Sequence, residues 1–195
     1  MKLPKTAHTT RDWRIHEFTR DFRLEDVWAL PTPGDHDDFP RLVRQMVSGD
    51  PYGVSIVART LWAIRWRIGK LLAWDRLDNR HDTELPTLRD RLPADLREAP
   101  SGPEFEALPL KSVYLTDNEW AAEIVNKTVH GVMHISWVPN ESGGYRGQMA
   151  VLVKPNGLLG RLYMSAIRPF RYMIIYPALM REIARDWRVR IDHVE

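Results

Sequence analysis

The 195-residue sequence predicts a single α+β domain spanning residues 1–195, and three features of the chain lead to that class. Two neighbouring segments, residues 127–138 and 145–154, alternate apolar and polar residues as antiparallel strands do. Residues 158–187 then carry apolar residues every three or four positions, which is typical of a core-facing helix. Two shorter helical stretches lie earlier in the chain. Strands followed by a long C-terminal helix favour an α+β arrangement.

The first half of the chain contains one expected strand and the two shorter helices. Residues 12–18 alternate loosely, which indicates a first strand. A short helix is expected over residues 39–46, with Pro40 in its first turn. A longer helix is expected over residues 54–74, because its apolar residues fall in one stripe. Residues 75–109 are polar and rich in proline, so they predict a long irregular excursion of the kind that is often functional or mobile.

The two expected strands form a hairpin whose inner face can be read from both alternation patterns. A one-residue slip would place the apolar side chains of one strand beside charged positions of the other, so the pairing is well specified. The predicted pairs are Trp137 with Tyr145, Ile135 with Gly147, and Met133 with Met149. On that inner face Gly131 and Gly147 omit side chains, which predicts gaps where a helix or ligand approaches closely.

His130 and His134 fall on the opposite face of the first of these strands. Four residues of strand separate two side chains by about 13 Å, which is too far for one metal ion with ligand bonds of about 2 Å. We therefore expect no metal site, and we expect both imidazoles to point away from the core. In the C-terminal helix, Pro169 and Pro177 each remove an internal hydrogen bond, so that helix is expected to bend.

Composition narrows the function classes. A formal net charge of +2 is too small to indicate nucleic-acid binding. The chain has no Cys, no apolar leader and no glycine-rich nucleotide motif, so we expect a cytoplasmic protein without a cofactor. The longest late run without charge, residues 172–180, is far below the roughly 18 residues of a membrane span.

Three further groups of residues are weighed as candidate sites. The acids of Asp35–Asp38 are expected to favour a helix N-terminus rather than a cation. Glu119 and Glu123 would share a face of a helical turn, where a solvated surface is favoured over an acid–base pair. Trp62 and Trp66, on a basic helix flank, would form an interaction patch or a homodimer contact if they are uncovered.

Residues 154–180, "KPNGLLGRLYMSAIRPFRYMIIYPALM", together with residues 61–75, "LWAIRWRIGKLLAWD", resemble a bacterial domain-of-unknown-function family. Its members are often found behind epimerase-like NAD(P)-binding domains. The family looks like a branch of the superfamily of START domains, polyketide cyclases and birch-pollen allergens. The resemblance implies a helix-grip fold, in which an antiparallel sheet wraps around a long C-terminal helix and binds apolar small molecules. It implies no catalytic residues.

The leading hypothesis is a protein that binds an apolar small molecule in a cavity between the sheet and the C-terminal helix. An enzyme of cyclase or hydrolase type, using polar groups such as Tyr145 or Tyr163 in that cavity, is the alternative. An interaction module built on Trp62 and Trp66 is the third reading. The expected ligand-binding residues are Gly131, Met133, Ile135, Trp137, Tyr145, Gly147, Met149, Tyr163, Ile167, Phe170 and Ile174.

Overall fold

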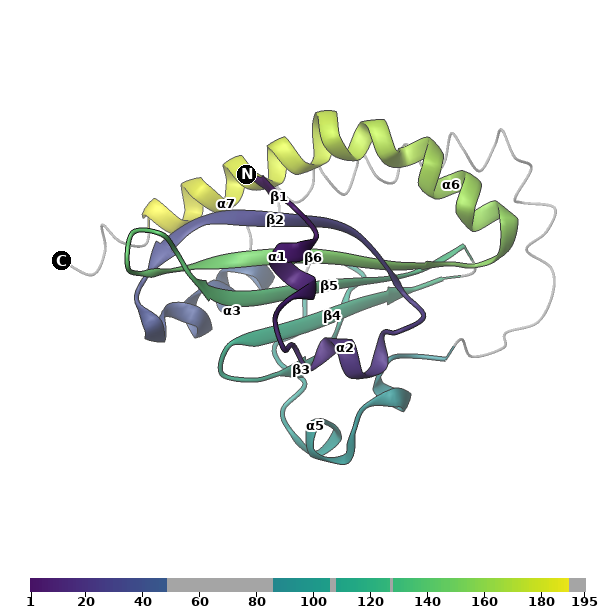
Figure 1. Cartoon of the computed structure of the whole chain (residues 1–195), viewed down its shortest axis with the longest axis horizontal. Helices are drawn as coiled ribbons and strands as arrows, with labels where there is room; N and C mark the ends of the chain where they lie inside the picture. Colours follow the sequence, from purple (N-terminus) through teal and green to yellow (C-terminus); the bar gives the residue numbers. More distant parts are fainter. Residues whose placement is uncertain (49–85, 106–107, 127, 190–195) are drawn as a thin grey trace.

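The computed structural model describes residues 1–48, 86–105, 108–126 and 128–189. It confirms the α+β class: a six-stranded antiparallel sheet has the order β1-β2-β6-β5-β4-β3, and a long C-terminal helix runs along it (Figure 1). The strands are β1 Lys2–Leu3, β2 Arg23–Gly34, β3 Lys111–Leu115, β4 Glu119–Val125, β5 Val129–Pro139 and β6 Tyr145–Pro155.

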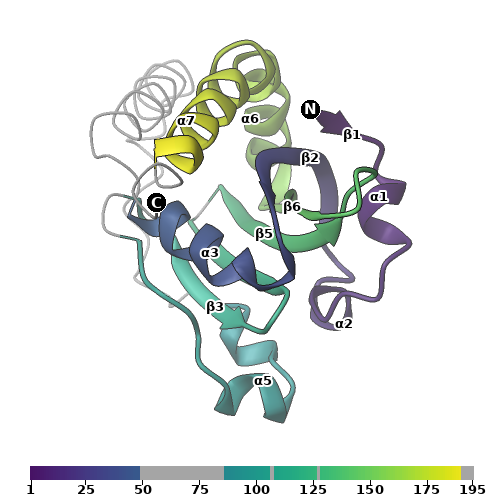
Figure 2. The same ribbon diagram turned by 90° about the vertical axis from the view of Figure 1, so that its left-hand side faces the viewer.

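Helical elements cover both faces of this sheet. Figure 2 shows the C-terminal helices and α3 on one side of β2, β6 and β5, with α1 and α2 on the other. The helical elements are α1 Thr6–Thr9, α2 Ile15–Phe18, η1 His36–Asp38, α3 Phe39–Val47, η3 Arg89–Arg91, α5 Ala94–Glu98, α6 Gly157–Phe170, the π-turn η4 Arg171–Ile175, and α7 Tyr176–Val189. The expected helix over residues 54–74, with Trp62 and Trp66, lies outside the described residues.

The hairpin of β5 and β6 forms where the alternation predicts it, but the predicted register is wrong by two residues. Trp137 pairs with Gly147 and Ile135 with Met149, and the strands close at Pro139 and Tyr145. The turn decides this register: the side chain of Asn140 accepts hydrogen bonds from the N–H groups of Ser142 and Gly144, at 2.9 and 3.1 Å. A shift of two residues keeps every side chain on its face, so alternation alone leaves the two registers equivalent.

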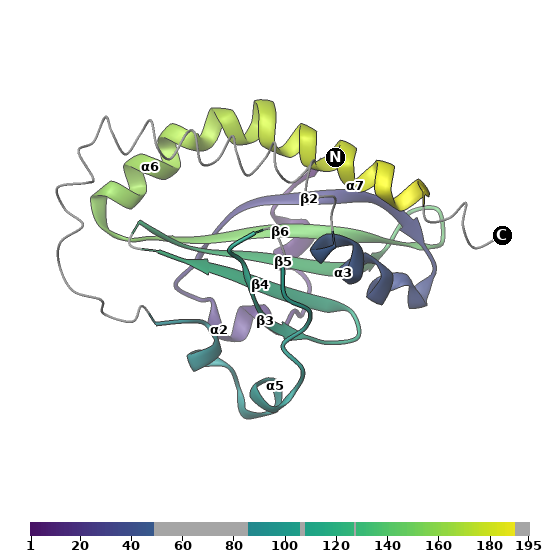
Figure 3. The same ribbon diagram turned by 180° about the vertical axis from the view of Figure 1, so that it is seen from behind.

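On one face of the sheet, the residues that were expected to be inner pack against α3 and α7. This helix-side core contains Ile135, Trp137 and Met149 from the sheet, with Ile183 and Trp187 from α7. Figure 3 shows α3 beside α7 at this end of the sheet. The contact is polar as well as apolar, since the α3 residues Arg41 and Gln45 donate hydrogen bonds to backbone carbonyls of α7 at 2.8 and 2.9 Å.

The C-terminal helix changes its winding where the two prolines predict an irregularity. Pro169 lies inside α6 and Pro177 in the first turn of α7, and the five-residue π-turn η4 lies between them. Each proline lacks the N–H that an α-helical pattern would use, so the wider hydrogen-bonding of a π-turn is accommodated there. The N–H of Tyr176 accordingly donates to the carbonyl of Arg171.

The opposite face of the sheet carries a second core, which the sequence analysis did not foresee. Residues 12–18 were expected to form a strand, but they contain the helical turn α2, whose Ile15 and Phe18 are buried on this face. Two apolar residues that are two positions apart, such as Trp13 and Ile15, can be buried either in a strand or in a helical turn. This short alternation therefore does not distinguish the two kinds of structure. Within the expected excursion, residues 86–105 form η3 and α5, and Leu88, Leu92 and Leu96 pack against the same face.

Candidate functional site

The expected ligand-binding residues divide into a closed end and a more open end of the helix-side face. At the end covered by α3 and α7, Ile135, Trp137 and Met149 are at most 4% exposed. The gap expected at Gly147 is filled: an added Cβ there would lie 2.7 Å from Leu42 and 2.9 Å from Leu30. Gly147 therefore allows α3 to approach the sheet closely, and this part of the face is solid.

Nearer the start of α6 the burial varies, since Val129 and Val153 are buried on this face but their neighbours are less so. Gly131, Met133 and Val151 are only half-buried on the same face. At Gly131 an added Cβ would meet one side-chain atom within 4 Å, the Cγ2 of Ile124 at 3.3 Å. The helix-side face is therefore less buried at Gly131, Met133 and Val151 than at Ile135 and Met149.

The helix residues expected to line the cavity differ among themselves in burial. Ile167 is 5% exposed, whereas Phe170 and Ile174 are 42% and 44% exposed. Tyr163 is half-buried in α6. Tyr145 lies at the far end of the sheet, stacked on Trp137 with ring centroids 6.5 Å apart, so it is not near the open end.

A polar centre lies where η4 meets β2. The buried carboxylate of Asp26 accepts hydrogen bonds from the guanidinium of Arg171, from the hydroxyl of Tyr172 and, at 2.9 Å, from the hydroxyl of Tyr176. Burial alone would raise the pKa of Asp26, but the hydrogen bond from Tyr172 and the charge of Arg171 outweigh it, so that pKa is lowered. The π-turn is what brings these three donors to one carboxylate.

A pocket of 240 Å³ opens beside this centre, between β1, β2 and α6. Its lining includes four cationic side chains, those of Lys2, Lys5, Arg23 and Arg168. Its acids are Asp26, which Arg171 neutralises, and Glu25, whose Oε1 lies 3.2 Å from the Nε of Arg23. The pocket is therefore cationic, and the sequence analysis did not single out any of its residues.

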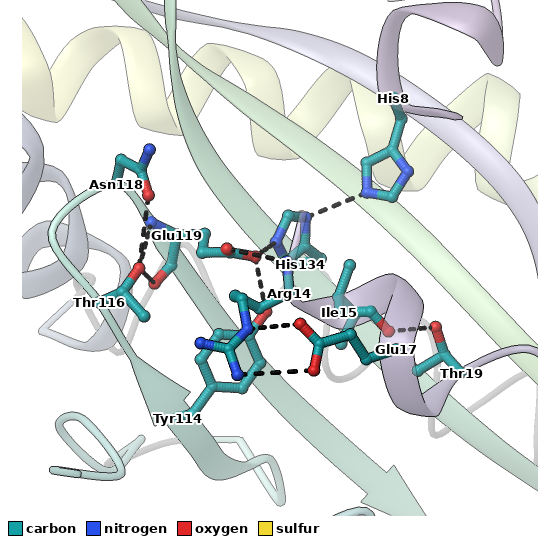
Figure 4. A network of polar contacts seen from close by, with 10 residues as sticks. All are labelled: His8, Arg14, Ile15, Glu17, Thr19, Tyr114, Thr116, Asn118, Glu119 and His134. Atoms are coloured by element: carbon teal, nitrogen blue, oxygen red, sulfur yellow. Dashed lines mark hydrogen bonds and ion pairs between the residues drawn. The ribbon is translucent and has the colours of Figure 1, made fainter. Parts of the chain in front are cut away.

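The second polar region lies on the opposite face, beneath the N-terminal segment (Figure 4). The carboxylate of Glu119 accepts hydrogen bonds from the Tyr114 hydroxyl at 2.7 Å, from the Arg14 backbone N–H at 3.0 Å and from the His134 Nε2 at 2.9 Å. The His134 Nδ1 lies 3.1 Å from the Nε2 of His8. Since His134 donates through Nε2, its Nδ1 accepts, and His8 is the donor.

Burial sets the protonation of this network. His134 and His8 are both fully buried, which lowers the pKa of His134 and lowers that of His8 to about 3. Burial would raise the pKa of Glu119, but its hydrogen bond with His134 and its other donors lower it on balance. The network therefore contains an ionised carboxylate and two neutral imidazoles. The Nδ1 of His8 has no hydrogen-bond partner among the described residues.

Glu123 repeats the arrangement nearby, with its Oε2 2.6 Å from the Nε2 of His130 and 2.9 Å from the Leu88 backbone nitrogen. The expectations that the histidines point away from the core and that Glu119 and Glu123 lie on a solvated helical turn are therefore wrong. β4 is a buried strand, and each of its two acids lies diagonally across from a histidine of β5, since Glu119 pairs with Ser136 and Glu123 with Val132. The prediction that His130 and His134 share the face opposite Trp137 is confirmed.

These acid–imidazole pairs are closed to solvent, so a substrate does not reach them in this conformation. They attach the N-terminal segment and residues 86–105 to the sheet. Among the described ranges, no group of three or more His, Asp or Glu side chains is placed to hold a metal ion. In the same ranges, no helix is long and apolar enough to cross a membrane.

The fold and its two polar regions define an α+β protein whose helix-side face is apolar and whose opposite face is held by buried acid–imidazole pairs. Residues 18–178 match the family described as "Protein of unknown function (DUF2867)", and the chain belongs to that family. No curated protein and no solved structure matches the chain significantly.

Proposed function

We propose that the chain binds an apolar small molecule against the helix-side face, at the end of the sheet where α6 begins. The observation that supports this function is the change in burial along the face. Ile135 and Met149 are closed, whereas Met133 and Val151 in the next row are half-buried. An apolar ligand would complete the burial of this row, with the flexible side chain of Met133 adapting to its shape.

The helix would supply the other side of this site. Ile167 is buried toward the sheet, and Phe170 lies on the flank of the helix opposite Arg168, since successive helix residues are rotated by about 100°. Phe170 and Ile174 therefore offer apolar surface away from the cationic pocket. The closed residues Ile135, Trp137, Gly147 and Met149 would form the solid end of the site rather than its lining.

The strand order supports the helix-grip fold as part of the same proposal. β2 pairs with β6, the last strand, and the C-terminal helix returns across the face that these strands share. Such an arrangement places a helix over an antiparallel sheet with a space between them that side chains or a ligand must fill. The proposal further includes a single domain, a cytoplasmic location and the more distant link to START-like proteins.

The expected affinity follows from the area that a ligand would bury. Burying about 300 Å² of apolar ligand surface at ~25 cal/mol/Å² contributes roughly 7–8 kcal/mol. Association entropy removes several kcal/mol, which leaves about 4 kcal/mol and a dissociation constant on the order of millimolar. The bonded state of Asp26, Arg171 and Tyr176 favours this binding role over a catalytic one, because their polar atoms are already engaged with one another.

Titration with the neutral dye Nile red tests the proposal, with substitutions at Gly131. Gly131→Leu would fill the space beyond the single contact with Ile124, and we expect it to weaken dye binding at least about tenfold. Gly131→Ala adds only the Cβ and should bind the dye like the parent. Circular dichroism must show that both variants stay folded. A folded Gly131→Leu protein that binds the dye as the parent does would contradict the proposed site.

The homodimer contact expected at Trp62 and Trp66 stays a prediction, because both residues lie outside the described ranges.

Mass spectrometry of the protein purified under native conditions would identify a ligand that co-purifies with it. A lipophilic compound present in stoichiometric amount in the parent, and lost from Gly131→Leu, is the result that the proposal expects.

A further inference from the structure

The outer side of α6 and η4 carries an exposed apolar ridge, which we define as Leu158, Leu162, Phe170, Met173 and Ile174. Their side chains are 73%, 59%, 42%, 77% and 44% exposed, respectively. They make up five of the seven exposed large apolar side chains among the described residues. Several exposed apolar side chains on one helix indicate an interaction site.

The apolar spacing of residues 158–187 predicts a core-facing helix, and for the side chains of this ridge that prediction is wrong. Ile167, Arg171 and Ile175 are the buried residues of this part of the helix. Because most positions of α6 and η4 are apolar, the spacing defines more than one stripe, and the π-turn shifts the helix phase. Leu162 and Met173 consequently lie in solvent.

Cationic side chains accompany the ridge on one flank of the helix, which is the flank away from Phe170. Arg161 and Arg168 are exposed on the same helix, and the sequence contains no acidic residue between positions 157 and 181. Arg168 also lines the cationic pocket, where Lys2 and Lys5 stand across from it. The Nζ of Lys2 lies 2.9 Å from the Tyr172 hydroxyl, which connects the N-terminal strand to η4.

We propose that the ridge docks on a membrane surface rich in anionic lipids. An amphipathic helix with Leu and Phe on one side and Arg beside them lies in the plane of the membrane interface, with its apolar side chains among the acyl chains. The cations on that flank would meet the anionic head groups. α6 lies on the outside of the molecule, where it can reach such a plane (Figure 1).

The charges favour this occupant over a second copy of the chain. A symmetric contact between two ridges would bring Arg161 and Arg168 of each copy toward the same cations of the other, and like charges repel across an interface. An anionic surface instead complements them. The ridge shares Phe170 and Ile174 with the proposed ligand site, but Leu158, Leu162 and Met173 belong to the ridge alone. The inference therefore goes beyond that site and does not depend on it.

Vesicle co-sedimentation of the full chain tests the inference. We expect the protein to sediment with vesicles of phosphatidylcholine and phosphatidylglycerol, and to stay in solution with phosphatidylcholine alone. The double variant Leu162→Gln/Met173→Gln should lower the partition coefficient at least about tenfold. Val189→Gln, at the 51% exposed Val189 of α7, removes a comparable apolar side chain outside the ridge and should bind like the parent.

A second double variant tests how much the arginine charges contribute to vesicle binding. Arg161→Gln/Arg168→Gln should lower partitioning onto the anionic vesicles roughly tenfold or more, and high salt should have the same effect on the parent. Partitioning that the Leu162→Gln/Met173→Gln variant retains would overturn the inference, as would an absence of binding to anionic vesicles. A dimer in light scattering that this variant disperses would assign the ridge to a second copy and also overturn it.

The ligand-site proposal and the membrane-docking proposal can be refuted independently. Gly131→Leu should lose Nile red binding and still sediment with anionic vesicles. Leu162→Gln/Met173→Gln should lose vesicle binding and still bind the dye in solution. A variant that abolishes both activities while remaining folded would show that ridge and ligand site are one surface, which contradicts the docking inference as stated.

Discussion

Acid should destabilise this protein through His8, well above the pH at which its carboxylates titrate. His8 is fully buried, and burial lowers its pKa from the ordinary 6.5 to about 3. Between these two values the unfolded chain binds one more proton than the folded chain at this position, so the free energy of unfolding must fall as the pH falls. The loss begins near pH 6.5, where the unfolded imidazole becomes charged.

The magnitude follows from the width of the pH window. Each pH unit below 6.5 removes about 1.4 kcal/mol per imidazole that stays neutral in the folded state, which amounts to about 2 kcal/mol by pH 5. The lowered pKa of His134 adds in the same direction. The pKa values of Asp26 and Glu119 are lowered, so their contribution to stability is lost only at a lower pH than this window.

Substitution of His8 isolates its share. In His8→Gln the amide nitrogen can take the place of Nε2 and donate to the His134 Nδ1, but the side chain does not titrate. Urea unfolding followed by tryptophan fluorescence should show, below about pH 6, a slope lower by about 1.4 kcal/mol per pH unit than that of the parent, and nearly equal slopes for the two proteins above about pH 7.

His36 supplies the control, because its side chain is 77% exposed in η1. His36→Gln should change the slope by less than His8→Gln does, because the His36 side chain is not buried. If His8→Gln unfolds with the same pH dependence as the parent, the imidazole of His8 is not held neutral in the folded state, and the reasoning is refuted.

Two further predictions concern packing and the buried ion pair. Gly147→Ala should lower the unfolding free energy by about 1–3 kcal/mol, because its Cβ would overlap Leu42 at 2.7 Å. Gly131→Ala should change the unfolding free energy by less than about 1 kcal/mol. Equal effects of the two substitutions in urea unfolding would contradict this difference in packing. Asp26→Asn should lower the unfolding free energy by about 3–5 kcal/mol, because it leaves Arg171 buried without its counter-charge. A melting temperature equal to that of the parent would show that the pair is not buried in solution.

Part of the candidate site followed from local patterns, and part did not. The half-buried row at Met133 lies on a face that strand alternation assigns correctly, because neighbouring side chains in a strand must point to opposite sides. The pairs of Glu119 with His134 and of Glu123 with His130 were missed. The two strands β4 and β5 bring these residues together across the sheet, and no spacing along the chain predicts that pairing.

The sequence by itself determined the β5–β6 hairpin, the short helix α3 and a C-terminal helix that is irregular between Pro169 and Pro177, because alternation, turn residues and missing N–H groups act locally. Only the tertiary structure decided the rest. It buried both faces of the sheet, filled the space above Gly147 with α3, and left the apolar ridge of α6 outside. These outcomes depend on which element packs against which, and several packings are compatible with the same local preferences.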